Sequence, residues 1–349
     1  MSMLTRRHAL AALGAAGAVS LVPGFARRAR AQGSRKVVFT QSTDGFLYVP
    51  IHVARARRYF EEEGIEPEVI VTGGGSKAIA AVVGGSAQVY VGNAASQVNA
   101  LSKGQPLLSF AAVMTEFASN LVMQGHLARE RGITAASPVA DKVAALKGLK
   151  VGITSPGSAT DQILRYLLQK QGIQPDRDVT VIPVGGSGPM IAAFSQKRID
   201  AFVLSSPTAE TAVVKHGGVM LVNFSRGEYE PLAGILYMSL IAKKDWLEQN
   251  AETAVAVCRA LARAERLINE RPDEAKAAVR GFFEKTEPAV FDQAWESNVK
   301  AYPATPVIAA AAMQKAIDFM NATEEEKASV TVAQAMDNRY AEAAVKGAK

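Results

Sequence analysis

The chain has 349 residues, enough for about two domains of average size. Hydrophobic residues make up 48% and charged residues 21%, which excludes a disordered or low-complexity chain. The net charge of +6 would suit nucleic-acid binding, but residues 1–31 hold five arginines and no lysine or acidic residue. Removing those five charges leaves +1 for the rest of the chain, so we expect no nucleic-acid partner.

The first 31 residues have the three regions of an export signal in the expected order. The pair Arg6-Arg7 precedes a weakly apolar stretch from Ala9 to Phe25, and Ala29-Arg30-Ala31 follows as a small-x-small cleavage pattern. This resembles a bacterial Tat-type signal peptide, which predicts cleavage after Ala31 and a periplasmic mature protein. The alternative is an amphipathic N-terminal helix.

A β-loop-α pattern begins after the leader. Residues 36–40, 68–72 and 87–91 are short apolar runs typical of buried strands, and polar or glycine-rich loops follow them. Helices are expected at 48–63 and 77–83. This alternation is typical of a parallel sheet with helical crossovers.

The same pattern returns about 112 residues later, where Gly73 aligns with Gly185. This second copy predicts two lobes of similar topology. Its expected strands and helices, in chain order, are 149–154, 159–171, 179–184, 189–196 and 199–203.

Two further strands are expected at 219–223 and 236–242, and the remaining chain reads as helical. Because the second block is inserted, the chain must cross twice between lobes, with candidate crossings near 121–127 and 225–235. We expect lobe 1 to comprise residues 34–122 and 234–349, and lobe 2 to comprise residues 123–233. The C-terminal helices are expected at 245–250, 253–270, 272–283, 288–302 and 306–321.

Hydroxyl, amide and glycine residues cluster where the predicted strands end. In open parallel sheets, ligands bind outside the carboxyl ends of the strands, where helices begin with free N–H groups. Each loop alone could equally be a turn with a helix N-cap, and Asp44 could bind an amine or cap a turn. The loop residues are Ser42, Thr43, Asp44, Gly74, Gly75, Ser76, Asn93, Ser96, Ser155, Ser158, Thr160, Gly186, Ser187 and Gly188.

Catalytic and metal-binding patterns are not evident in the sequence, so we expect no catalytic residue, metal or cofactor. The one cysteine, Cys258, lies in an expected amphipathic helix and is interpreted as a small buried hydrophobe. Asp44 and His52 are the nearest candidate acid-base pair, although His52 falls within a predicted helix.

Two segments resemble a known family. Asp44 to Ala54, followed by Tyr59 to Ile65, is similar to its opening signature, and Leu146 to Ile153, followed by Gly157-Ser158, is similar to its middle signature. The family is the nitrate/sulfonate/taurine-type, or SsuA/THI5-like and NMT1-like, substrate-binding proteins of ABC importers. The resemblance covers about residues 36–300.

The resemblance implies an α/β, type II periplasmic-binding-protein fold with two lobes, two crossover segments and a ligand cleft between them. It implies a monomer that carries a small polar or anionic solute to an inner-membrane ABC permease. A THI5-like enzyme and a ligand-sensing module are the alternatives, although the cysteine-rich motif of the THI5-like enzymes is missing. The residues expected to line the cleft are Ser42, Thr43, Asp44, Tyr48, Gly75, Ser76, Asn93, Ser155, Ser158, Thr160, Ser187 and Ser205.

Overall fold

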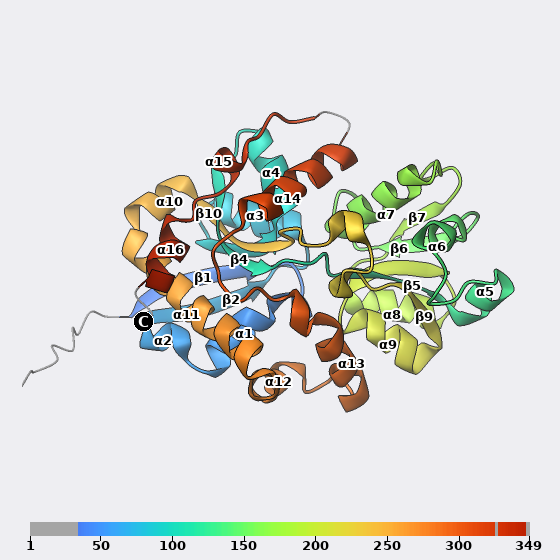
Figure 1. Cartoon of the computed structure of the whole chain (residues 1–349), viewed down its shortest axis with the longest axis horizontal. Coiled ribbons are helices and arrows are strands. Elements are labelled where there is room, and N and C mark those ends of the chain that lie inside the picture. Colours follow the sequence, from blue (N-terminus) through green and yellow to red (C-terminus); the bar gives the residue numbers. More distant parts are fainter. Residues whose placement is uncertain (1–33, 325–326, 347–349) are drawn as a thin grey trace, which may run out of the picture. The chain divides into compact units, whose positions relative to one another are not determined.

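The two predicted β-loop-α blocks form two five-stranded sheets, seen in a computed structural model that describes residues 34–324 and 327–346 (Figure 1). The predicted leader lies outside the described residues. The strand orders are β2-β1-β3-β10-β4 and β7-β6-β8-β5-β9, which are the same order once β10 is matched with β5. This confirms the predicted repeat. The strands are β1 (Arg35–Gln41), β2 (Ile65–Val71), β3 (Val89–Asn93), β4 (Leu107–Met114), β5 (Ser119–Gln124), β6 (Lys150–Ile153), β7 (Thr180–Pro183), β8 (Ala201–Ser205), β9 (Gly218–Val222) and β10 (Met238–Lys243).

Each sheet is mixed rather than purely parallel, which corrects the sequence prediction. β1 pairs in parallel with β2 and β3, whereas β10 runs antiparallel to β3 and β4. In the second sheet β5 lies between β8 and β9 and runs antiparallel to both. The reason is topological, because β5 and β10 are the strands with which the chain enters a lobe from the other one.

The chain crosses between the sheets at residues 115–118 and again at residues 223–237. The first crossing therefore precedes the predicted one at 121–127, which lies within β5 and α5 (Gly125–Glu130). For the same reason the lobe boundary expected at residue 122 falls inside β5. The second crossing contains the predicted segment 225–235.

Helices flank both sheets, and one predicted helix is broken. The expected helix at 48–63 divides into a 3-10 turn at Phe46–Tyr48, α1 (Val49–Ala56) and α2 (Tyr59–Glu62), because Arg58 adopts a left-handed conformation with φ of 58°. The next helices are α3 (Gly75–Val83), α4 (Ala94–Ser102), α6 (Val139–Ala144), α7 (Ala159–Lys170), α8 (Ser187–Ser195) and α9 (Thr208–His216). The C-terminal helices are α10 (Lys244–Gln249), α11 (Ala251–Glu270), α12 (Pro272–Val279), α13 (Pro288–Asn298), α14 (Ala310–Thr323), α15 (Val332–Ala335) and α16 (Arg339–Lys346).

Two C-terminal helices connect the lobes outside the crossover segments. α13 packs against α9 of the second lobe, and α14 packs against both α4 and α7 (Figure 1). α11 packs on α1 and α16 and stays with the first lobe. The second lobe is therefore held at the crossover strands and also by these two helices.

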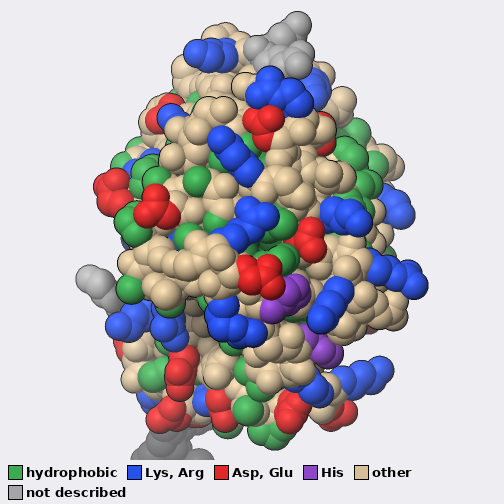
Figure 2. Space-filling model, turned by 90° about the vertical axis from the view of Figure 1, so that its right-hand side faces the viewer, with side chains coloured by type: hydrophobic (Ala, Val, Ile, Leu, Met, Phe, Trp, Pro, Cys, Tyr) green, Lys and Arg blue, Asp and Glu red, His purple; other side chains and the backbone are tan. Residues whose placement is uncertain are grey.

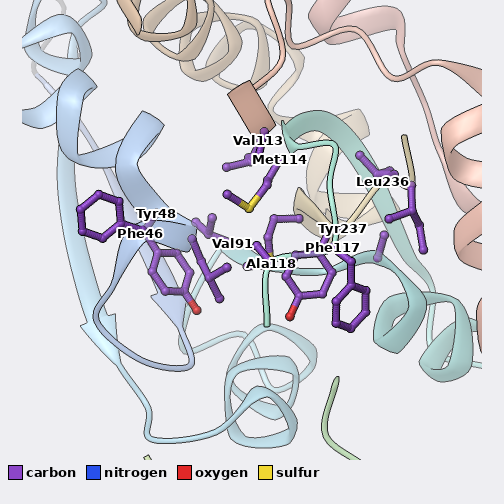
Figure 3. Close-up of a cluster of buried hydrophobic side chains, with 14 of the residues drawn as sticks. Phe46, Tyr48, Val91, Val113, Met114, Phe117, Ala118, Leu236 and Tyr237 are labelled. Carbon is purple, nitrogen blue, oxygen red and sulfur yellow. The ribbon is translucent and has the colours of Figure 1, made fainter. Parts of the chain in front are cut away.

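A buried aromatic cluster anchors the crossovers in the first lobe (Figure 3). The ring of Phe117, from the first crossover, lies 4.4 Å from that of Tyr237 in the second crossover and 5.5 Å from that of Phe319 in α14. Burying such rings stabilises a fold by about 1.5–3 kcal/mol each. The cluster thus holds both crossovers at a defined place beside the first sheet.

The outer face of the second lobe carries basic and acidic side chains scattered among each other, with hydrophobic side chains only in small groups between them (Figure 2). Among residues 34–324 and 327–346, no helix has the length and the hydropathy required to span a bilayer.

Candidate ligand-binding cleft

A cavity of about 310 Å³ lies between the two sheets, at the loops where the strands end. Its volume suits a small molecule. Both lobes and the second crossover contribute to its wall. Nine of the twelve predicted site residues line it: Ser42, Thr43, Gly75, Ser76, Asn93, Ser155, Ser158, Thr160 and Ser205.

The first-lobe wall begins with the loop after β1. The Tyr48 hydroxyl accepts a hydrogen bond from Ser42 N at 3.2 Å and lies 2.8 Å from Ser42 Oγ. The Gln41 amide donates to the Thr43 carbonyl and to Asp44 Oδ1, both at 3.0 Å. These bonds hold Ser42 and Thr43 at the cavity.

Tyr90 forms a part of this wall that the sequence analysis did not predict. A Cβ on Gly92 would lie 1.8 Å from the Tyr90 ring, so the ring lies directly over this glycine. A Cβ on Gly75, at the start of α3, would lie 3.0 Å from the Tyr90 hydroxyl. Burial raises the pKa of Tyr90 further above its usual value of 10.0, so the phenol is neutral at pH 7 by a wide margin. The two glycines therefore provide the space for an aromatic hydroxyl at the cavity.

Asn93 is the N-cap of α4, and its side-chain oxygen accepts hydrogen bonds from Ser96 N at 2.8 Å and Ser96 Oγ at 3.1 Å. Its amide nitrogen lies 3.4 Å from the carbonyl oxygen of Tyr237 in the second crossover. Asn93 thus caps a helix and also lines the cavity, so the two interpretations of the sequence are compatible.

The second-lobe wall is a compact cluster of hydroxyls. Thr154, Ser158 and Thr160 form a triangle with hydroxyl separations of 2.8–2.9 Å. Thr160 Oγ1 accepts from Thr154 N at 2.9 Å, and Ser158 caps α7. These hydrogen bonds hold the three oxygens in place. Each hydroxyl hydrogen can still rotate toward a ligand, and the backbone does not have to move.

Ser119, the first residue of β5, and Tyr237, the last residue of the second crossover, complete the cavity. Their hydroxyls lie 2.7 Å apart, and both residues are buried. Burial raises the pKa of the Tyr237 phenol further above its usual value of 10.0, and this pair too is neutral at pH 7. Figure 3 shows the hydroxyls of Tyr48 and Tyr237 pointing toward the same side of the aromatic cluster.

The cavity lining is polar but almost uncharged. Among the described lining residues the one ionisable side chain other than tyrosine is Lys103, which is exposed. Four helices begin at the cavity, namely α3, α4, α7 and α8, so their free N–H groups converge there. Each helix start favours a negative group by about 0.3–1 kcal/mol.

Three predicted residues do not line the cavity. Asp44 is exposed and bonds to Gln41, so it lies outside the wall. Tyr48 is fully buried and acts through Ser42. At the start of α8, Gly185 and Gly186 line the cavity in place of Ser187.

The two strongest candidates for a catalytic side chain, His52 and Cys258, do not line the cavity. Burial, with a smaller effect of Arg55, lowers the pKa of His52 to about 3, and its ring stacks on Phe282 at 4.4 Å. Cys258 is buried in α11, and burial raises the pKa of its thiol. Neither lines the cavity, so both have the structural roles that the sequence favoured.

Comparison with known proteins agrees with this geometry. The sequence profile of the NMT1-like family matches residues 36–281. The chain belongs to this family. It is 24% identical to the YtlA binding protein of Bacillus subtilis over 296 residues, which cover 83% of each chain. It is 32% identical to the nitrate/nitrite binding protein NrtA of a Nostoc species over 124 residues, covering 34% of this chain and 26% of that protein.

Solved structures show the same fold. A Bordetella bronchiseptica protein superposes with a TM-score of 0.78 at 26% identity, covering 90% of this chain and 98% of that one. The alkanesulfonate-binding protein SsuA of Xanthomonas axonopodis, solved with bound MOPS, superposes with a TM-score of 0.67 at 18% identity, covering 88% and 100%. The predicted family and the periplasmic-binding-protein fold are confirmed.

Proposed function

We propose that this protein is the solute-binding component of an ABC importer and captures a small polar or anionic organic solute between its two lobes. The observation that carries the proposal is the cavity lined by hydroxyl and amide groups from both lobes. A ligand that contacts both lobes favours the state in which they are close together, which is how binding drives closure.

The lining narrows the class of ligand. The wall offers hydrogen-bond donors at four helix starts and carries almost no charged side chain. Such a wall suits a singly charged anion or a zwitterion, because the donors can bind the anionic group and the wall does not require a ligand with a large opposite charge. Relatives and structural neighbours are named for nitrate, nitrite and sulfonate binding. We therefore propose nitrate, a sulfonate, taurine or a pyrimidine precursor as the solute.

The proposal places the mature protein in the periplasm as a monomer that meets an inner-membrane permease. It includes export through the Tat-type signal and cleavage after Ala31. The name of one neighbour, the periplasmic aliphatic sulphonate binding protein SsuA of Escherichia coli, supports the compartment.

A thermal-shift panel tests the proposal with ethanesulfonate, taurine, nitrate, an aminopyrimidine and benzoate. A ligand at about a hundred times its Kd stabilises the native state by about 2.7 kcal/mol, which corresponds to a rise in Tm of about 4 °C for a chain of this length. Mass spectrometry should recover that ligand unchanged, whereas conversion would indicate an enzyme. If no member raises Tm, the proposed ligand class is wrong.

Two variants locate the binding site. Ser76→Trp and Ser158→Trp place a large side chain on opposite walls, and each should abolish the rise in Tm. Ser195→Trp is the matched control, because Ser195 is exposed at the end of α8 and does not line the cavity. An unchanged response in both wall variants would contradict the assignment of the cleft.

A further inference from the structure

The end of α14 brings one carboxylate between the two lobes. α14 belongs to the C-terminal helices, and it packs along α4 of the first lobe and α7 of the second (Figure 1). Glu324 is the residue that follows it, at its C-cap. The side chain of Glu324 therefore stands where the two lobes approach each other.

One oxygen of Glu324 joins amides from both lobes. Asn99 on α4 donates from Nδ2 to Glu324 Oε1 at 2.8 Å, and Gln162 on α7 donates from Nε2 to the same oxygen at 3.3 Å. Asn99 and Gln162 both line the ligand cavity. The carboxylate thus links the first-lobe wall to the second-lobe wall beside the ligand site.

These bonds also determine which end of the Gln162 amide stays free. Gln162 is only 4% exposed, and its Oε1 has no hydrogen-bond partner within the described part of the chain. Because a carboxylate accepts but cannot donate, it holds the NH₂ end of this amide and leaves the carbonyl end unpaired. A buried acceptor without a hydrogen bond costs free energy, so the second-lobe wall would be stabilised by a donor that reaches Gln162 Oε1.

A second, larger cavity of about 1240 Å³ adjoins the ligand cavity at this point. Asn99 and Lys103 line both cavities, and Glu324 lines the larger one. The Asn99–Glu324–Gln162 bridge therefore lies at the boundary between the ligand cavity and the more open space beside it.

We propose that Glu324 is a positioning residue of the binding site, which ties the lobes together through Asn99 and Gln162 before any ligand arrives. This inference rests on the proposed function, because the bridge matters only if the lobes close on a solute. Holding the lobes together in advance lowers the conformational cost of binding and closes one end of the ligand cavity.

The distance between the lobes tests this without a ligand. Spin labels are placed at Lys77→Cys on α3 and Gln169→Cys on α7, where both side chains are exposed. Cys258 is buried, so the native thiol does not react under mild labelling. Double electron–electron resonance then gives the distribution of distances between the lobes.

Glu324→Ala should increase the ratio of long-distance to short-distance populations by about tenfold, as expected for loss of the one hydrogen bond to a charged group, from Gln162, that spans the lobes. Glu324→Gln keeps the side-chain length and should give a smaller increase. Glu284→Ala removes an exposed glutamate on the first lobe and should leave the ratio unchanged. If Glu324→Ala does not fold, the Gln variant alone decides.

A distribution identical to that of the wild type in the folded Glu324 variants would overturn the bridge. The thermal-shift panel separates this result from failure of the proposed function. A retained rise in Tm together with unchanged distances refutes only the role of Glu324, whereas loss of every ligand response in the wild type refutes the function and the inference that rests on it.

Discussion

The two lobes share one strand order but present different chemistry to the cavity. The first-lobe wall contains tyrosine hydroxyls, with Tyr90 at the cavity and Tyr48 behind Ser42. The second-lobe wall is a cluster of small hydroxyls around Thr160. A repeated topology thus places loops at equivalent positions, while the residues in those loops determine what each wall can recognise.

The difference is also one of packing. The first wall depends on a ring that occupies the space above Gly92. In the second wall, a Cβ added to Gly186 would meet no heavy atom within 4 Å, and this glycine does not have a left-handed φ. We therefore expect an added methyl group to be disruptive at Gly92 in the first lobe and tolerated at Gly186 in the second.

The largest expected effect comes from testing this contrast with the same substitution in both walls. Gly92→Ala forces the Tyr90 ring away and should destabilise the protein by about 2–3 kcal/mol, as overpacking of a core does. It should also abolish ligand binding. Gly186→Ala should change stability by less than about 0.5 kcal/mol. Urea unfolding of both variants measures the difference, and equal effects would contradict the contrast.

A smaller effect separates two buried carboxyls. Burial raises the pKa of Glu265 in the first lobe well above its usual value, and both of its oxygens lack partners within the described residues. Burial also raises the pKa of Glu210 in the second lobe, where the Ser206 hydroxyl donates to Glu210 Oε1 at 2.8 Å. Glu265 is therefore buried without a hydrogen bond, whereas Glu210 receives one from Ser206.

Because the pKa of Glu265 is higher in the native state than in the unfolded state, protonated Glu265 favours the native state. This contribution to the free energy of unfolding is fully present below the unfolded pKa near 4.5 and is lost as pH rises through the native pKa. Glu265→Gln removes this loss and should stabilise the protein at pH 8 by about 1 kcal/mol or more relative to its effect at pH 4. Glu210→Gln should show a smaller gain. Urea unfolding at the two pH values checks both variants, and a gain that does not depend on pH would contradict the explanation.

Strong local patterns made most of the fold predictable. The strands β1, β3 and β7 have apolar runs between glycine-rich or polar segments, and the glycine repeat indicated the shared topology. β4 and β5 were not predicted, and the first crossing was expected at residues that lie in β5 and the start of α5. An apolar run does not reveal which sheet it joins, because that depends on partners far away in the sequence.

The cavity residues that lie at the first turn of a helix could be predicted from the sequence. Asn93 ends β3 and Ser158 lies in the loop after β6, and both cap helices, so their position follows from local sequence. Tyr90 and Tyr237 were missed because their hydroxyls reach the cavity only through tertiary packing, over Gly92 in one case and beside Ser119 in the other. Asp44 was expected in the cleft, but its bond to the neighbouring Gln41 keeps it outside.

A co-crystal structure with the panel member that raises Tm most would test the central claim most directly. The account predicts that the ligand contacts both walls at once, with hydrogen bonds from the Thr154–Ser158–Thr160 cluster and from the Ser42 or Tyr90 side. A ligand bound to one lobe alone, or in the larger neighbouring cavity, would contradict it.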